Sequence, residues 1–477
     1  MTETMALAFE DREYSLADLD ALTAGMADTL QHRGVGAGSR VAVMSSNRPE
    51  FVVALRAIWR LGAAAVLLSP AWKRAEVDHA VSLTKPSHAV GDHPVLSDVM
   101  PMLHLDAPIV AAESSPRPVD PAADAVFVFS SGTTGMPKGV RHTHASLAAA
   151  VRHWRAGLQL TSADRLQIMT PPSHILGLLN IVMALDTGAW IRLHRRFDID
   201  AMLRHIESDR ITIEMAVAPI ALALSAHPGL ERHDLSSLRY IMWCATPVTE
   251  SVAQAVTART GVRWVTAYGA SELPVISCND LDGARLDTVG RAVDGVRIRI
   301  VSLETGEPVG PGTEGEIQVH CDAAMAGYLP ESSTAGAFSG PWYRTGDVGT
   351  LDADGWLRIT DRAKEMIKVR GFQVAPAEIE AVLHGHRAVE DCAVFGVPAV
   401  DGEAIVAAVK ADGAVDPDEL AGLVAQRLAS YKRPSRVVLV DDIPRLPSGK
   451  VLRRVLRERV MSACAKNGGN CGRPLDR

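Results

Sequence analysis

In the segment Val126-Phe-Val-Phe-Ser-Ser-Gly-Thr-Thr-Gly-Met-Pro-Lys-Gly139, an apolar run leads directly into a loop rich in glycine and hydroxyl side chains. The apolar run is typical of a buried strand, and a helical pattern follows from about His144. Glycine lets the backbone curl so that successive N–H groups face one point, the hydroxyls add donors, and Lys138 adds a mobile positive charge. The segment therefore predicts a phosphate-binding loop. It is not a Walker A loop, because no Gly-Lys-Ser/Thr sequence closes it.

On both sides of this segment, helical patterns alternate with short apolar runs. The helical patterns lie at 15–33, 48–62, 144–157, 199–208, 216–227 and 249–260, and the apolar runs lie at 41–44, 64–68, 125–129, 166–169, 190–193, 240–242 and 264–267. Strands that alternate with helices predict an α/β fold with largely parallel sheets.

The pattern changes twice in the last third of the chain. From about 295 the strand candidates are short and separated by Gly, Pro and Asp turns, which predicts a β-rich subdomain. Later strands and helices indicate a small α+β unit. We expect four parts: an N-terminal domain at 1–360 whose β-rich subdomain spans about 295–360, a hinge at 361–364, a small mobile α+β domain at 365–460, and a disordered Gly/Asn-rich tail at 461–477.

Composition excludes several classes of protein. The 477 residues are 47% hydrophobic and 22% charged with a formal net charge of −7, which is ordinary for a globular chain and excludes fibrous or disordered ones. Nothing in this balance indicates a nucleic-acid partner. The most apolar stretch, 51–70, contains Arg56, Arg60 and Gly62, so we expect no membrane span.

The cysteines and the N-terminus indicate the compartment. The six cysteines are scattered, and none has CxxC or Cys/His zinc spacing, so we expect reduced thiols. The acidic N-terminus lacks the apolar core of a signal peptide. Both observations predict a cytoplasmic protein.

Seven further motifs occur in a fixed order along the chain, and one of them is the expected hinge. They are Pro171-Pro-Ser-His174, Trp243-Cys-Ala-Thr-Pro247, Tyr268-Gly-Ala-Ser-Glu272, Tyr343-Arg-Thr-Gly-Asp347, Asp361-Arg-Ala-Lys364, the stretch 367–380, and Pro447-Ser-Gly-Lys450. Together with the Ser/Thr/Gly loop, they resemble the ordered motifs of the adenylate-forming superfamily, which comprises acyl-CoA and aryl-CoA synthetases, firefly luciferase and the adenylation domains of peptide synthetases. The resemblance covers about residues 10–460.

The resemblance implies an ATP-dependent carboxylic acid–CoA ligase. Such an enzyme forms acyl-AMP with release of pyrophosphate and then transfers the acyl group to the thiol of CoA, so ATP, Mg²⁺ and CoA are expected. The main alternative is an acyl-AMP ligase that loads an acyl carrier protein, because its phosphopantetheine offers the same thiol. A catalytically silent nucleotide sensor and a luciferase-like oxygenase are further alternatives.

Adenylation brings a carboxylate to a phosphate, so it requires positive charge between two anions. The resemblance implies that Lys138 holds the β- and γ-phosphates, that Glu272 binds Mg²⁺, and that Asp347 accepts hydrogen bonds from the ribose hydroxyls. The full set implied for ATP and AMP is Ser130, Ser131, Gly132, Thr133, Thr134, Gly135, Lys138, Ala245, Thr246, Thr266, Tyr268, Gly269, Ser271, Glu272, Asp347, Arg362 and Lys450.

Catalysis and acid binding are assigned in the same way. Lys450 would bridge the acid and the α-phosphate, His174 would lie beside the substrate carboxylate, and Lys138 completes the catalytic set. The acyl pocket would be lined by Leu176, Asn180, Met242, Ala245, Ala267 and Pro274. The thiol would pass Lys368, Arg370 and Gly371 after rotation about Lys364.

Four residues depart from the family pattern. Ser173 replaces an aromatic residue, Cys244 a glycine, and Thr266 an amide side chain. Leu176 stands where coumarate-type ligases tend to carry an aromatic residue with a hydroxyl. With mostly small apolar neighbours, Leu176 favours an aliphatic or plain aromatic acid, although Asn180 leaves room for a polar substituent.

Overall fold

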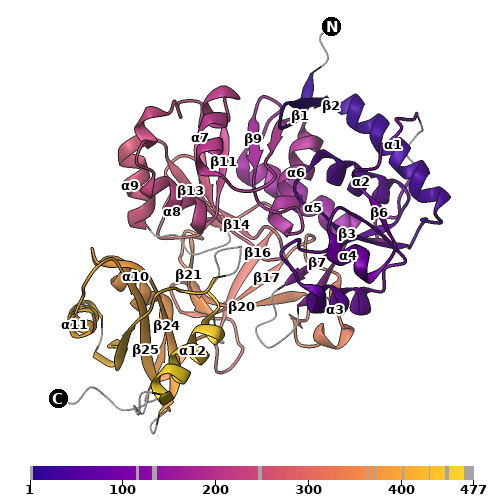
Figure 1. Ribbon diagram of the computed structural model, residues 1–477. Helices are drawn as coiled ribbons and strands as arrows, with labels where there is room; N and C mark the ends of the chain where they lie inside the picture. Colours follow the sequence, from indigo (N-terminus) through magenta and orange to yellow (C-terminus); the bar gives the residue numbers. More distant parts are fainter. Residues whose placement is uncertain are drawn as a thin grey trace.

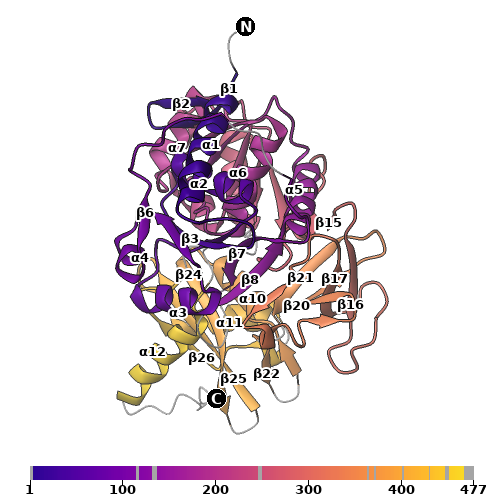
Figure 2. The same ribbon diagram turned by 90° about the vertical axis from the view of Figure 1, so that its right-hand side faces the viewer.

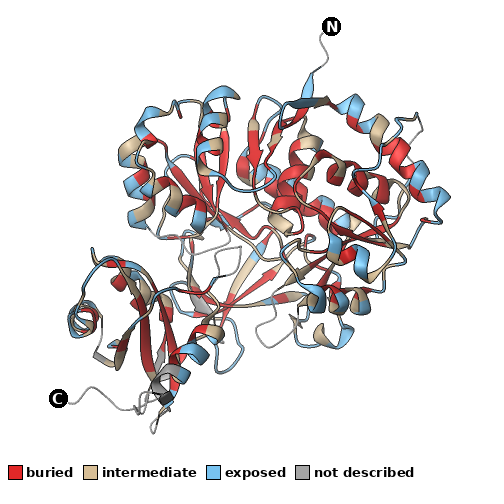
Figure 3. Ribbon diagram, in the orientation of Figure 1, coloured by how far each residue is buried: buried red, intermediate tan, exposed pale blue. Residues whose placement is uncertain are grey.

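The computed structural model describes residues 4–113, 118–130, 137–244, 250–362, 365–369, 372–399, 402–428, 430–445 and 451–466 (Figure 1). Two large sheets, a smaller β-rich sheet and a C-terminal unit follow one another along the chain. Buried residues concentrate on the strands and on the helix faces that cover them (Figure 3).

The first large sheet carries the phosphate-loop segment. Its strand order is β18 (Gly327–Leu329), β8 (Lys138–Thr143), β7 (Asp124–Ser130), β4 (Ala64–Leu67), β3 (Arg40–Met44), β5 (His88–Gly91) and β6 (Met102–His104). Strands β7 to β6 are parallel, whereas β8 is antiparallel to both β7 and β18. The accompanying helices are α1 (Leu16–His32), α2 (Pro49–Arg60), α3 (Arg74–Thr84), α4 (Pro94–Val99) and α5 (His144–Leu158).

The second large sheet is parallel in its centre and antiparallel at both edges. Its order is β15 (Arg291–Ala292), β14 (Ser277–Cys278), β13 (Trp264–Tyr268), β12 (Tyr240–Trp243), β11 (Ile213–Ala216), β9 (Arg165–Ile168), β10 (Trp190–Leu193), β1 (Met5–Phe9) and β2 (Arg12–Ser15). Its helices are α6 (Ile175–Thr187), α7 (Ile199–Ser208), α8 (Ala218–Ala226), η1 (Leu230–Arg232) and α9 (Glu250–Thr260). The predicted α/β fold with parallel-rich sheets is confirmed.

The predicted β-rich region is also present. It is an antiparallel sheet of β16 (Arg297–Val301), β17 (Gly315–His320), β20 (Trp342–Leu351) and β19 (Phe338–Ser339), with β21 (Leu357–Arg362) paired to β20 and η2 (Glu331–Ser333) before β19. Asp347 of the Tyr343–Asp347 motif lies within β20. The long strand continues through it because Asp347 pairs with Arg362 across the ladder.

The C-terminal unit has its own sheet and its own buried cluster. The strands are β22 (Ile367–Val369), β23 (Phe372–Val374), β24 (Val389–Ala399), β25 (Gly402–Ala411) and β26 (Arg436–Leu439), and the helices are α10 (Pro376–His384), α11 (Pro417–Arg427), η3 (Ser430–Lys432) and α12 (Arg453–Lys466). In two perpendicular views this unit lies below the large sheets and beside β21 (Figures 1 and 2).

One expected boundary is wrong. The tail was predicted to begin at 461, but residues 461–466 are the end of α12. Apolar residues recur among basic ones through this segment, and most of them have good helix propensity, so the helix includes it. The hinge residues 363 and 364 lie outside the described residues, so the position of the hinge stays a prediction. No helix within the described ranges is long and apolar enough to cross a membrane.

Candidate active site

The phosphate loop connects the two strands of a hairpin. Ser130 at the end of β7 pairs with Lys138 at the start of β8, so the loop begins and ends at the same edge of the sheet. The Nζ atom of Lys138 lies 5.3 Å from the centroid of the Tyr328 ring, which is within the range of a cation–π interaction. The positive charge is thereby held at the mouth of the loop.

Tyr328 contacts both Lys138 and Glu272, the predicted magnesium ligand. Its hydroxyl donates a hydrogen bond of 2.8 Å to Oε1 of Glu272, whose side chain is largely buried. Tyr328 reaches this place because β18 pairs with β8, with Tyr328 opposite Val140. Tyr343 is buried beside the same pair, and burial together with the charge of Glu272 raises its pKa, so it stays a neutral phenol.

The turn that carries Glu272 is fixed by His142. Nε2 of His142 donates to the backbone oxygen of Ser271 at 2.7 Å, and complete burial lowers the pKa of His142 to about 4. The imidazole is therefore neutral at pH 7. Gly269 is required in this turn, because a Cβ there would lie 2.0 Å from the backbone oxygen of Pro274.

The predicted ribose and adenine residues contact one another. The Tyr268 hydroxyl donates to Oδ2 of Asp347 at 2.5 Å, and Asp347 is 6% exposed. The backbone N–H of Asp347 donates to the Thr345 hydroxyl at 3.0 Å, which fixes the carboxylate at the start of this bulged part of β20. The backbone of Asp347 pairs across the ladder with that of Arg362.

Of the predicted acyl-pocket residues, Met242 and Ala267 lie on β12 and β13 of the second sheet, and Leu176 and Asn180 lie on α6. Met242 and Ala267 belong to the same hydrophobic cluster as the buried face of α6, and Leu176 packs against that cluster. Asn180 is buried on α6, where its Oδ1 accepts a 2.8 Å hydrogen bond from Trp154 Nε1. Its Nδ2 has no hydrogen-bond partner within the described ranges. Pro274 lies, half-buried, just after Glu272.

His174 is the N-cap residue of α6, and burial lowers its pKa. The first turn of this helix lies against the motif loop, because a Cβ on Gly177 would approach the backbone oxygen of Pro171 to 2.4 Å. Ser173 is buried, and its Oγ has no hydrogen-bond partner among the described residues. The close packing of Gly177 against the Pro171 backbone thus fixes the N-terminus of α6, where His174 lies.

Like Ser173, two further departures from the family pattern, Cys244 and Thr266, are buried. Cys244 follows β12, and burial raises the pKa of its thiol to about 12, so the thiol is protonated at neutral pH and is a poor nucleophile. The hydroxyl of Thr266 donates to the backbone oxygen of Thr288 at 2.9 Å. To donate a hydrogen bond to a nucleotide, the Thr266 hydroxyl would have to give up its bond to Thr288.

Several predicted residues lie outside the described part of the chain. They are Ser131, Gly132, Thr133, Thr134, Gly135, Ala245, Thr246, Lys364, Arg370, Gly371 and Lys450. For Arg362 and Lys368 the structure describes the backbone alone, in β21 and β22. The roles of all these residues stay predictions.

Sequence reasoning missed Tyr328, Tyr343 and His142 as members of this site. Tyr343 and His142 stand within or next to quoted motifs, so their proximity to the site was a usable signal. Tyr328 had no such signal, because only the pairing of β18 with β8 brings it to Glu272.

Comparisons with known proteins agree with these motifs. The family model described as AMP-binding enzyme matches residues 2–329, and the model of the AMP-binding enzyme C-terminal domain matches residues 378–450. 4-Coumarate–CoA ligase 5 of Oryza sativa subsp. japonica is 34% identical over 483 residues, which cover 94% of this chain and 89% of the relative.

Solved structures are similar over almost the whole chain. ATP-bound MatB from Rhodopseudomonas palustris has a TM-score of 0.91 and 27% identity, covering 97% of this chain and 96% of that one. The o-succinylbenzoate coenzyme A synthetase MenE from Bacillus subtilis, in complex with ATP and a magnesium ion, has a TM-score of 0.87 and 28% identity, covering 95% and 97%.

Proposed function

The chain belongs to the AMP-binding enzyme family, the adenylate-forming superfamily whose motifs it carries, and from this premise we propose that it is an ATP-dependent carboxylic acid–CoA ligase. In the first step a carboxylate oxygen attacks the α-phosphate of ATP, and pyrophosphate leaves. In the second step the CoA thiol attacks the acyl carbon, and AMP leaves.

The observation that carries this proposal is the convergence of Lys138, Tyr328 and Glu272. An ammonium and a buried carboxylate that both contact Tyr328 suit a metal–triphosphate complex, because the cation would bind phosphate oxygens and the carboxylate would bind the metal. Preorganised charge of this kind stabilises the transition state without reorganisation. The Tyr268–Asp347 pair would hold the nucleoside at the other end of the same ligand.

Glu272 fits a magnesium site. Mg²⁺ prefers carboxylate, phosphate and water oxygens, and Glu272 offers a carboxylate whose orientation Tyr328 fixes through Oε1. When bound, Mg²⁺ would neutralise part of the triphosphate charge. Lys138 would add a direct contact to the β- and γ-phosphates, while His142 keeps the 269–272 turn in place.

The remaining roles rest on the motifs. Lys450 would bridge the acid and the α-phosphate during adenylation, and Lys368, Arg370 and Gly371 would line the thiol path in the second step. Both groups belong to the C-terminal unit and would act at one adenylate, so a rotation about Lys364 between the steps is part of the proposal. His174, neutral and at the head of α6, would lie beside the acid.

The acid is proposed to be aliphatic or an aromatic acid without a ring hydroxyl. Leu176, Met242 and Ala267 offer apolar surface. The relatives include enzymes named for 4-coumarate, but Leu176 cannot donate to or accept from a phenol. The unpartnered Nδ2 of Asn180 is the one donor in this set and would recognise an acceptor on the acyl chain.

The test is pyrophosphate release across a panel of fatty and aryl acids, followed by thioester analysis with either free CoA or holo acyl carrier protein. We expect acid-dependent pyrophosphate release and thioester with free CoA. Thioester with the carrier protein alone would favour the acyl-AMP ligase. Absence of acid-dependent pyrophosphate release would leave a nucleotide-binding protein without ligase activity.

A further inference from the structure

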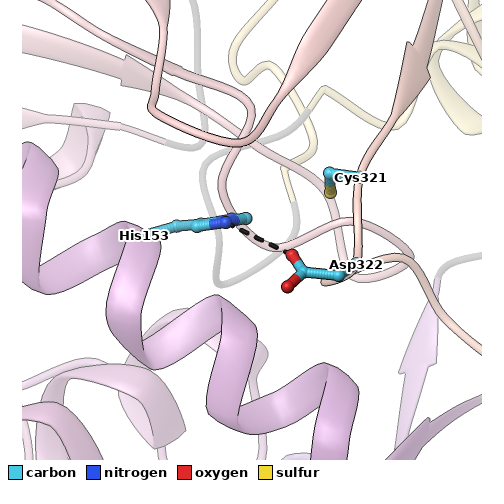
Figure 4. Close-up of side chains that lie close together, drawn as sticks. All are labelled: His153, Cys321 and Asp322. Atoms are coloured by element: carbon cyan, nitrogen blue, oxygen red, sulfur yellow. Dashed lines mark ion pairs between the residues drawn. The ribbon is translucent and has the colours of Figure 1, made fainter.

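A cavity of about 700 Å³ lies away from the active site, between α5 and the β-rich sheet. Its wall includes His153 of α5 and Cys321 and Asp322, which directly follow β17. Figure 4 shows the imidazole of His153 pointing toward the carboxylate of Asp322, with the thiol of Cys321 on the same side. One nitrogen, one sulfur and one oxygen ligand therefore converge from two elements that are distant in sequence.

The distances suit a small tetrahedral ion. Nε2 of His153 and Oδ1 of Asp322 are 3.3 Å apart. Two ligand atoms bound at 2.0–2.1 Å to a tetrahedral centre are separated by about 3.3–3.4 Å. The three ligand atoms all lie within 4.8 Å of one another. A Zn–S bond of about 2.3 Å would need the sulfur to move by at most ~1.2 Å, which a side-chain rotation supplies.

The surroundings of His153 give independent support. Its side chain is more than nine-tenths buried, so the imidazole is held in place by the residues packed around it. Gly295 faces Nε2, and a Cβ there would lie 3.2 Å from this atom, so glycine keeps the space in front of it open.

We propose that His153 Nε2, Cys321 Sγ and a carboxylate oxygen of Asp322 bind one Zn²⁺ ion, with the fourth position open to the cavity. Nitrogen and thiolate ligands favour zinc over the hard ions Mg²⁺ and Ca²⁺, so this site is distinct in chemistry from Glu272. The thiolate is the ligand, so binding releases the Cys321 proton to solvent. Cysteine spacing in the sequence gave no zinc signal, because the ligands come from residues 153 and 321–322.

The bound ion would join two parts of the active-site framework. Helix α5 begins one residue after β8, which starts at Lys138. The segment after Asp322 continues to Tyr328, and on the way Met325 N–H donates to the backbone oxygen of Glu272 at 2.8 Å. A zinc ion at the start of this segment would therefore stabilise the folded protein by linking α5 to it.

The experiment uses the full chain with Cys464 and Cys471 replaced by serine, so that these two thiols contribute nothing. The protein is treated with a chelator, desalted and titrated with Zn²⁺, and Co²⁺ is added separately to report thiolate ligation by its near-ultraviolet charge-transfer absorption. We expect one Zn²⁺ per chain, the Co²⁺ absorption, and a rise in Tm of ~2 °C or more at saturating Zn²⁺.

Matched variants locate the site. Cys321→Ser and His153→Gln should weaken Zn²⁺ binding at least ~100-fold, more than the loss from removing an outer hydrogen-bond partner, and Cys321→Ser should abolish the Co²⁺ absorption. Cys392→Ser, which removes a thiol in the C-terminal unit, and Asp294→Asn, which removes a carboxylate from the same cavity wall, should bind as the parent does.

A substitution at an exposed residue tests the proposal even if variants of the metal-binding residues fail to fold. Arg152 pairs with Oδ2 of Asp322 at 2.7 Å and competes with the metal for this carboxylate. Arg152→Ala, at a largely exposed position, should therefore bind Zn²⁺ about 2–5-fold more tightly, the range of one surface ion pair. Absence of Zn²⁺ binding by the parent, or unchanged binding and absorption in Cys321→Ser, would overturn the proposal.

Discussion

Tyr328 has two contacts that can be separated by substitution. Its hydroxyl donates to Glu272, and its ring lies against the ammonium of Lys138. Tyr328→Phe removes the first contact and keeps the second. A hydrogen bond to a charged group is worth roughly 1.5–3 kcal/mol, so we expect the Mg²⁺ concentration for half-maximal activity to rise about 10-fold or more.

The measurement is a Mg²⁺ titration of pyrophosphate release at saturating ATP and acid. Tyr14→Phe, which alters a partly buried tyrosine on strand β2 of the other large sheet, serves as the control. An unchanged Mg²⁺ requirement in Tyr328→Phe would mean that Tyr328 does not orient the metal ligand.

Lys138 should act on ATP more than on the acid. Lys138→Ala removes one charged contact to the phosphates, a loss of roughly 1.5–3 kcal/mol, so the KM for ATP should rise by about 10-fold or more. Steady-state titrations of both substrates measure the difference, with the exposed Lys85→Ala as control. If the KM for the acid rises while that for ATP is unchanged, the assignment of Lys138 is wrong.

At the scale of elements, a buried chain of polar groups runs from β11 through β9 to His194, the residue after β10. Nε2 of Gln167 donates to Oε2 of Glu214 at 2.6 Å, and Nε2 of His194 lies 2.8 Å from Oε1 of the same glutamine. Burial raises the pKa of Glu214 to about 8 and lowers that of His194 to about 4, so both groups are uncharged at pH 7. Neutral groups at these positions let three neighbouring strands pack without a buried charge.

Glu214 predicts a pH dependence of stability with a definite sign. Between pH 4.5 and 8 the folded protein holds a proton on Glu214 that the unfolded chain has lost, so this group makes the free energy of unfolding fall as pH rises. The slope is at most about 1.4 kcal/mol per pH unit. Glu214→Gln keeps an acceptor for Gln167 and cannot ionise. The variant should match the parent near pH 4.5 and be more stable near pH 8.

Chemical denaturation at several pH values, compared between the two proteins, isolates this contribution. Histidines such as His142 have a lowered pKa, which makes the free energy of unfolding rise with pH between 4 and 6.5. These histidines are present in both proteins, so their contributions cancel in the comparison. A stability difference that stays constant from pH 4.5 to 8 would contradict a protonated Glu214.

The elements also show what the sequence can and cannot predict. The parallel strands were predictable, since each is a short apolar run next to a helical pattern, as in β3, β4 and β7. Strand β8 was not, because its sequence Lys-Gly-Val-Arg-His-Thr alternates only weakly and forms a strand by pairing with β7 and β18. Tyr328 and the Cys321–Asp322 pair reach their partners through such long-range pairings, which no local pattern encodes.

At the scale of the whole molecule, the predicted motifs divide between two bodies. Glu272 and Asp347 lie in the N-terminal part, whereas the stretch before α10 and Lys450 belong to the C-terminal unit, which has a separate buried cluster. A unit with its own core can move as a body without exposing that core. If this unit rotates as proposed, its two segments would serve the two half-reactions in turn.

Lys450 provides the test of this division of labour. In the first half-reaction, negative charge builds on the α-phosphate as the carboxylate attacks, and an ammonium that contacts both groups stabilises this transition state more than the separated reactants. In the second half-reaction the acyl group is already activated, and the rotation would have carried Lys450 away. We therefore expect Lys450→Ala to slow adenylation by about 10²-fold or more, the scale of losing one preorganised charge-stabilising group.

The two half-reactions are measured on one preparation: pyrophosphate release from ATP and acid, and thioester formation from synthetic acyl-AMP and CoA. The variant should form thioester at close to the parent rate, because no cation is needed where the phosphate–carboxylate bridge has already formed. Gly371→Ala is the reciprocal variant, since a Cβ beside the proposed thiol path should slow the second step and spare the first. If Lys450→Ala loses both half-reactions to the same extent, the lysine has no step-specific role, and the alternation of the C-terminal unit loses its chemical basis.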